Sequence, residues 1–284
     1  MSNIKLMYVT NNPQVAAIAQ AAGVDRLFVD MEYIGKDIRQ GGMDTVQSRH
    51  TFDDVRKIRA IADKAQLLVR CNPIHEATAD YTSSKEEIDE IVACGADIIM
   101  LPFFKTAQEV KTFIELVGGR AKTLPLIETK EAAECIDEIL EIDGIDEVYI
   151  GLNDLHLSYG LTFMFQLLAD GTVERLVSKI KAKGIPYGFG GIARIGDGIL
   201  PAERILTEHY RLGSTAVILS RSFCNTNKIT DLEEIKKIFN ENVTNLRAYE
   251  DVIRALSPED FERNVKVVVE KTAEIVEMIK EKNK

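Results

Sequence analysis

Short apolar segments recur along the chain, and each is followed by polar, glycine or proline residues and then by a segment with helical periodicity. Fully apolar segments of this length, rich in Val, Ile and Leu, are typical of strands that are buried on both faces. The eight predicted strands are 4–9, 27–31, 67–71, 97–101, 123–127, 147–150, 185–189 and 216–219. Such strands favour a parallel sheet over a half-exposed antiparallel one.

The segments between the strands predict helices, and local capping signals agree with this assignment. Thr51 precedes one helix with Asp54 three residues later, and Pro201 suits the first turn of another. The predicted helices are 13–22, 52–65, 85–94, 107–117, 130–139, 161–183, 201–211 and 231–239. Eight alternating units favour a closed (β/α)8 TIM barrel over an open sheet.

Two further helical segments, 241–255 and 256–284, follow the eighth unit. We therefore expect one domain over residues 1–284, with a barrel over about 1–240 and a C-terminal helical extension over about 241–284. The extension either packs on its own barrel or is exchanged with a neighbouring subunit.

The net charge of −10 disfavours binding to nucleic acid and to anionic membrane surfaces, so we expect a small-molecule substrate. The four cysteines, Cys71, Cys94, Cys135 and Cys224, are too widely spaced to indicate a zinc site or a disulfide framework. The N-terminal residues lack the pattern of a secretory signal, and no segment is apolar over eighteen residues. These features predict a cytoplasmic protein.

Charged and polar residues follow several of the predicted strands, where barrel enzymes place their active sites. Glu128 follows the fifth strand and Asp154 comes shortly after the sixth. Each acid on its own has the alternative role of capping the next helix. Because neighbouring parallel strands lie about 5 Å apart, the two carboxylates can instead converge on one hard cation. Water and substrate oxygens would complete its shell, which favours Mg²⁺ or Mn²⁺ over zinc.

Further candidates stand at the other strand ends. Arg70, at the end of the third strand, either forms an ion pair with Asp30 or Glu32 or stabilises a developing oxyanion beside the metal. Gly190 and Gly191 follow the seventh strand and Arg221 follows the eighth, the position at which many barrels bind phosphate. These glycines alternatively serve only as tight turns.

The stretch LPLIETKEAAECIDEILEIDGIDEVYIGLNDLHLSYG resembles the most telling signature of the HpcH/HpaI aldolase and citrate lyase family. FVDMEY, LVRCNP and GADIIMLPFFKT are similar to the family's second, third and fourth strands. The resemblance extends from the second to the sixth strand.

The resemblance implies that Glu128 and Asp154 are metal ligands and that Arg70 binds and polarises the keto-acid oxygens. It implies reversible carbon–carbon cleavage through a pyruvate-type enolate, and a homo-oligomer. Backbone N–H groups near Leu152 and Asn153 would help to hold the substrate carboxylate. Glu32, in the segment FVDMEY, is a further candidate for substrate binding.

The sequence departs from the family pattern at two places. Tyr33 replaces the histidine that the aldolases use with an aspartate, here Asp30, in proton transfer, and a phenol with a pKa of about 10 is a poor base. His50, in the long segment IGKDIRQGGMDTVQSRHT with Lys36, Arg39 and Arg49, is the alternative base. Leu152 and Asn153 stand where the family often has proline and a small residue.

Three functions agree with these residues. The first is a metal-dependent aldolase whose second substrate is anionic or phosphorylated. The second is an acyl-CoA lyase of the citrate-lyase β type, and the third is a metal-binding scaffold that has lost turnover.

Overall fold

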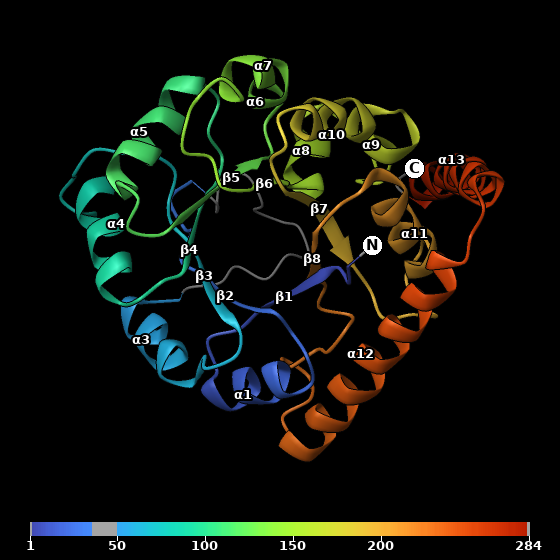
Figure 1. Cartoon of the computed structure of the whole chain (residues 1–284), viewed down its shortest axis with the longest axis horizontal. Coiled ribbons are helices and arrows are strands. Elements are labelled where there is room, and N and C mark those ends of the chain that lie inside the picture. Colours follow the sequence, from blue (N-terminus) through green and yellow to red (C-terminus); the bar gives the residue numbers. More distant parts are fainter. Residues whose placement is uncertain (1, 36–49, 283–284) are drawn as a thin grey trace.

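The computed structural model describes residues 2–35 and 50–282. Eight parallel strands close into a barrel in the order β1 to β8, and the helices form a ring around it (Figure 1). The strands are β1 Lys5–Val9, β2 Arg26–Asp30, β3 Gln66–Arg70, β4 Ile98–Leu101, β5 Lys122–Ile127, β6 Val148–Ile150, β7 Tyr187–Ile192 and β8 Ala216–Leu219. The predicted TIM-barrel fold is confirmed.

The helices connect successive strands and then continue past β8. They are α1 Pro13–Ala21, α3 Phe52–Ile61, α4 Ser84–Ala93, α5 Ala107–Val117, α6 Lys130–Glu134, α7 Ile136–Ile139, α8 Leu152–Ser158, α9 Gln166–Ala169, α10 Thr172–Ala182, α11 Ala202–Leu212, α12 Leu232–Arg254 and α13 Pro258–Lys282. Thr51 caps α3 in a capping box with Asp54, as predicted. Among the helices of residues 2–35 and 50–282, none has both the length and the apolar composition that a membrane span requires.

The structure corrects four predicted helices. The expected helix 130–139 is two short helices, α6 and α7, which are divided at Cys135. The expected helix 161–183 is two helices, α9 and α10, because the chain turns at Gly171, whose φ of +82° suits glycine. Segments 231–239 and 241–255 form one continuous helix, α12, since no residue between them interrupts the helical pattern. The short helix α8 was not predicted, and it begins directly after β6.

The two C-terminal helices pack on the barrel of the same chain. Helix α12 lies against α1 and α11, and α13 lies against α9 and α11 (Figure 1). Glu250 of α12 accepts a hydrogen bond from the Ile4 backbone N–H at 2.9 Å. Asn264 of α13 donates to Glu208 of α11 at 2.8 Å. Buried polar contacts thus fix both helices to the barrel.

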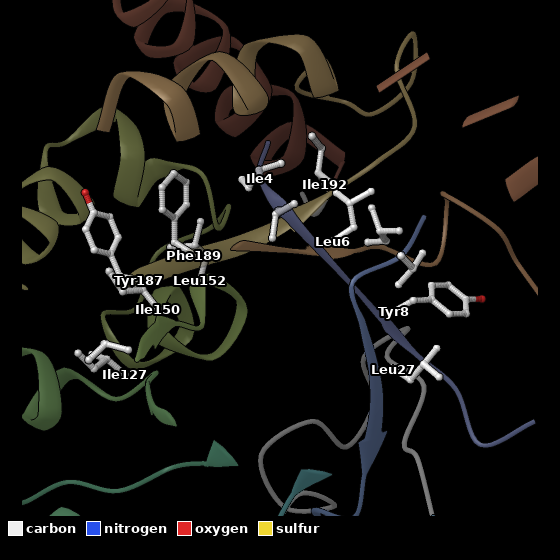
Figure 2. Packing of buried hydrophobic residues seen from close by; sticks show 14 of the residues in the cluster. Ile4, Leu6, Tyr8, Leu27, Ile127, Ile150, Leu152, Tyr187, Phe189 and Ile192 are labelled. Atoms are coloured by element: carbon white, nitrogen blue, oxygen red, sulfur yellow. The ribbon is translucent and has the colours of Figure 1, made fainter. Parts of the chain in front are cut away.

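Side chains of the strands alternate between the inside of the barrel and the layer between strands and helices. The outer layer is the main core, and Figure 2 shows Tyr187 and Phe189 of β7 beside Ile150 of β6 in this layer. The inner apolar layer is smaller; its buried members are Met7, Phe28, Leu68, Ile98, Met100, Leu124, Leu126, Tyr149 and Ala216. The barrel interior is therefore filled rather than hollow.

Below the inner apolar layer, a buried ion pair closes the amino-terminal end of the barrel. Arg26 has no exposed surface, and its guanidinium donates to both oxygens of Glu147 at 2.8 and 2.6 Å. Gln66 accepts a further hydrogen bond from the Arg26 Nε at 3.2 Å. Both charges are thus compensated inside the protein.

His209 of α11 is a buried histidine whose ring stacks on Phe189 at 3.8 Å. Burial lowers its pKa from 6.5 to about 3, so the folded protein holds this ring neutral. Below pH 6.5 the unfolded chain takes up a proton that the folded chain does not. We expect the contribution of His209 to stability to be complete above pH 6.5 and to be lost towards pH 3, by up to about 1.4 kcal/mol per pH unit.

Urea unfolding at pH 7.5 and pH 5 checks this expectation, with the difference between wild type and His209→Gln as the readout. The substitution removes the titrating group, so the pH dependence of the variant should be shallower by nearly one proton. Equal pH dependence in both proteins would contradict a buried neutral ring.

Candidate active site

A cavity of about 640 Å³ opens at the carboxyl ends of the strands. It brings together residues that are far apart in the sequence and that were predicted for the site. These are Asp30, His50, Arg70, Glu128, Leu152, Asn153, Asp154, Gly190, Gly191 and Arg221. Ten of the predicted residues thus share one cavity at the end of the barrel where the active site was expected.

The inward positions of three charged residues follow from strand alternation. Phe28, Leu68 and Leu126 belong to the inner apolar layer. Asp30, Arg70 and Glu128 follow them by two residues, and residues two apart on a strand share a face. The charged residues therefore form the upper layer of the barrel interior, directly above the apolar one.

Arg70 is held by two acids while it faces the cavity. Its Nε and one Nη donate to the two oxygens of Asp30 at 2.8 Å each, and Glu32 lies 3.3 Å from the other Nη. Burial on its own would lower the pKa of the guanidinium, but Asp30, Glu32 and Glu128 raise it well above its ordinary value. Arg70 is thus a fixed cation. The ion pair, which was one of the two alternatives from the sequence, is therefore present, and Arg70 still lines the cavity.

Glu128 is buried at the end of β5, and the Phe103 N–H donates to its Oε1 at 3.0 Å. Phe103 has a left-handed φ of +49°, which is unfavourable for a bulky residue and often accompanies functional sites. A Cβ at Gly151 would lie 2.9 Å from the Glu128 Oε2, so only glycine leaves room for this carboxylate. The carboxylate consequently lies against the first turn of α8.

Asp154 lies in the first turn of α8 rather than at the end of a strand, which corrects its predicted setting. The cause is that β6 passes into α8 at Gly151 without a loop. The N-terminal turn of a helix favours a carboxylate, and Asn153 donates to the Asp154 Oδ1 at 3.3 Å. Glu128 and Asp154 therefore reach the same cavity from β5 and from α8.

The carboxylates of Glu128 and Asp154 would supply part of the ligand set of a hard divalent cation. Both are buried oxygen donors of the kind that Mg²⁺ and Mn²⁺ prefer. No group of three or more His, Cys, Asp or Glu side chains suited to a metal occurs in the described ranges. Protein ligands from these ranges would therefore number two, and water and substrate oxygens would supply the rest.

The sequence profile described as HpcH/HpaI aldolase/citrate lyase matches residues 4–185, which span β1 to β6 together with α10. The chain belongs to this family. Members of the HpcH/HpaI aldolase/citrate lyase family are carbon–carbon lyases, and this chain is therefore an enzyme of that class.

Individual members resemble the chain at modest identity. A hydroxypyruvate/pyruvate aldolase of Roseovarius nubinhibens is 24% identical over 191 residues, covering 63% of this chain and 73% of that protein. A 2-keto-3-deoxy-L-rhamnonate aldolase of Escherichia coli is 23% identical over 221 residues, covering 67% and 75%. The crystal structure of an HpcH/HpaI aldolase from Desulfitobacterium hafniense superposes with a TM-score of 0.60 at 18% identity, covering 83% and 93%. The last comparison shows a shared fold.

Two residues assigned to the site from the family pattern lie outside the cavity. Tyr33, at the family's histidine position, is 42% exposed, and its ring packs 5.5 Å from that of Tyr81. Burial, with Glu87 and Tyr81, raises the pKa of Tyr33 above 10, so the phenolate that could act as a base is still scarcer at neutral pH. Glu32 is fully buried beside Arg70. It holds the guanidinium in place, and the structure gives it no surface toward a substrate.

His50 lies at the cavity instead of Tyr33. Its Nδ1 accepts a hydrogen bond from the Asp30 backbone N–H at 3.0 Å. An imidazole whose Nδ1 accepts a hydrogen bond carries its proton on Nε2 when it is neutral. This contact places His50 next to the Asp30–Arg70 pair. Lys36, Arg39 and Arg49 of the same segment lie outside the described residues.

Sequence reasoning missed part of the cavity wall. Thr10 and Asn11 line the cavity after β1, and Asn225, Thr226 and Asn227 line it after β8. The polar run Thr10–Asn12 directly after a buried strand is the same signal that identified the other strand ends. Residues 225–227 lie beyond the polar residues that directly follow β8, so this signal does not reach them.

Proposed function

We propose that the chain is a divalent-metal-dependent lyase that cleaves or forms a carbon–carbon bond through a pyruvate-type enolate. The observation that supports this most strongly is the meeting of Glu128, Asp154 and Arg70 in one cavity of a chain from this family. Glu128 and Asp154 would hold Mg²⁺ or Mn²⁺. A bound cation would supply Lewis-acid stabilisation of the negative charge that develops on the keto-acid oxygen.

The protein's own groups bind and orient the keto acid. Arg70, fixed by Asp30 and Glu32, presents a cation to its oxygen atoms without having to reorganise during the reaction. The first-turn N–H groups of α8, at Leu152 and Asn153, lack acceptors within the helix and would be available to a substrate carboxylate. The inner apolar layer closes the cavity from below and keeps water away from that side.

The second substrate would occupy the rest of the cavity, toward β7, β8 and β1. A three-carbon keto acid fills a small part of 640 Å³. Gly190, Gly191 and Arg221 line the remainder, and Arg221 adds positive charge that would suit an anionic or phosphorylated partner. A homo-oligomer in the cytoplasm is the setting we propose for this reaction.

Solvent-deuterium exchange into the methyl group of pyruvate tests the proposed function, because exchange requires the enolate. We expect exchange with Mg²⁺ or Mn²⁺ and none after chelation. Metal binding without exchange for several keto acids would favour a scaffold that has lost turnover. Exchange into acetyl-CoA but not into pyruvate would favour an acyl-CoA lyase of the citrate-lyase β type.

Proton transfer is assigned to His50 rather than Tyr33, and matched variants test this. His50→Gln should lower the exchange rate by about 10²-fold, since a positioned acid or base contributes on this order. Tyr33→Phe should leave the rate within twofold, because the Tyr33 ring packs on Tyr81 outside the cavity. The measurement is the initial rate of exchange at saturating Mn²⁺. The reverse ranking of the two variants would contradict the assignment.

A further inference from the structure

We propose that the hydroxyl of Tyr149 positions the β7–β8 side of the cavity for the second substrate and takes no part in forming the enolate. The β7–β8 wall is defined here as Gly190, Gly191 and Ile218 with the following Ser220 and Arg221, all of which line the cavity. The inference rests on the proposed function, because that function places the keto acid at Arg70, Glu128 and Asp154.

The hydrogen-bond ladder between β7 and β8 is irregular at the height of this wall. Gly188 pairs with Ala216 and Gly191 pairs with Ile218, so β7 uses one residue more than β8 between the two pairs. Such a bulge interrupts the ladder and turns the strand locally, and bulges are common beside active sites. Backbone groups near the bulge therefore need partners other than the neighbouring strand.

Tyr149 of β6 supplies these partners from inside the barrel. Its hydroxyl accepts a hydrogen bond from the Ile218 N–H at 2.9 Å and donates to the Gly190 carbonyl at 2.6 Å. The Phe189 carbonyl lies slightly farther away, at 3.2 Å. One hydroxyl thus joins β7 and β8 where their own pairing is broken. Burial raises the pKa of Tyr149 far above 10, so the group stays a neutral hydroxyl.

The joined segments form the cavity surface. Gly190 has a φ of +55°, and a Cβ there would lie 2.8 Å from the Leu152 Cδ1, so the wall packs closely on the first residue of α8. Without the Tyr149 hydroxyl, the Ile218 N–H and the Gly190 carbonyl would lose this partner in a partly buried region. We expect the wall to relax, while Glu128 and Arg70 keep contacts that do not involve Tyr149.

Tyr149→Phe tests this with two readouts on the intact enzyme with Mn²⁺: pyruvate exchange, and addition of pyruvate to glycolaldehyde, glyceraldehyde or glyoxylate. We expect KM for the aldehyde to rise about tenfold, which corresponds to the loss of one hydrogen bond. Pyruvate exchange, in both rate and KM, should stay within twofold. Tyr187→Phe is the matched control, because Tyr187 of β7 is also buried and donates to a backbone carbonyl, that of Leu212, but lies outside the cavity.

The other outcomes would contradict the positioning role, the placement of the second substrate or the proposed function. Equal losses in both readouts, an unchanged KM for the aldehyde, or a variant that does not fold when Tyr187→Phe does would overturn the positioning role. Gly191→Ala then tests the wall alone, since its added Cβ has only an ordinary contact at 3.6 Å and should still raise the aldehyde KM. Wild-type exchange without addition to any aldehyde would overturn the placement of the second substrate. Absence of wild-type exchange would instead contradict the proposed function.

Discussion

Replacing Glu128 by Gln is expected to reduce metal-dependent pyruvate exchange by at least about 10³-fold. The substitution keeps the size of the side chain but removes one of the two carboxylates proposed to hold the cation. The Glu128 carboxylate already occupies the space beside Gly151 that a Cβ would take. The substituted side chain therefore cannot move toward α8 to make up for the lost charge. Binding of Mn²⁺, followed by calorimetry, should weaken in parallel.

Glu131→Gln is the matched control, since Glu131 lies three residues later on α6 and pairs with Lys105 at the surface. This variant should exchange at the wild-type rate. A fully active Glu128→Gln enzyme with unchanged Mn²⁺ affinity would remove Glu128 from the metal site. Glu128 would then keep the hydrogen bond from the Phe103 N–H and its charge beside Arg70 as its roles.

Glu147→Gln is expected to lower the free energy of unfolding by about 3–5 kcal/mol. The variant leaves the Arg26 guanidinium, which has no exposed surface, without its countercharge. Denaturant unfolding followed by circular dichroism measures the change. Pyruvate exchange per folded molecule should be unaffected, because the inner apolar layer separates this pair from the cavity.

Asp137→Asn removes the acid of the surface pair with Lys179 and provides the comparison, with an expected change below about 1 kcal/mol. The double variant Arg26→Met with Glu147→Gln should recover much of the lost stability, because it removes the uncompensated charge. A Glu147→Gln protein as stable as the Asp137→Asn protein would show that Arg26 finds another partner.

The hydrophobic pattern predicts the strands well because burial on both faces leaves few alternatives for a short apolar segment. It failed where local residues decided the outcome. Gly171 divides an otherwise continuous amphipathic stretch, and α8 is too short for its periodicity to be recognised. The hydrophobic pattern also did not predict the end of β7, because two glycines carry no hydrophobic signal and a bulge extends the strand to Ile192.

In the site, too, the strand pattern predicts some positions, whereas local packing decides others. Asp30, Arg70 and Glu128 could be predicted because the strand period that buries Phe28, Leu68 and Leu126 also directs them inward. Tyr33 was placed by analogy with a family histidine, but the chain has already left the strand there, and its ring turns to Tyr81. His50 contacts Asp30 although 20 residues separate them in the sequence, and no hydrophobic periodicity predicts such a contact.

The layering of the barrel interior separates the buried charges that stabilise the fold from the buried charges that line the cavity. Arg26 and Glu147 lie below the apolar layer, whereas Asp30, Arg70 and Glu128 lie above it. Each charge has its neighbours within its own layer, so variation at the cavity leaves the lower ion pair undisturbed. Selection for a new substrate can therefore alter the upper residues while the lower end continues to specify the fold.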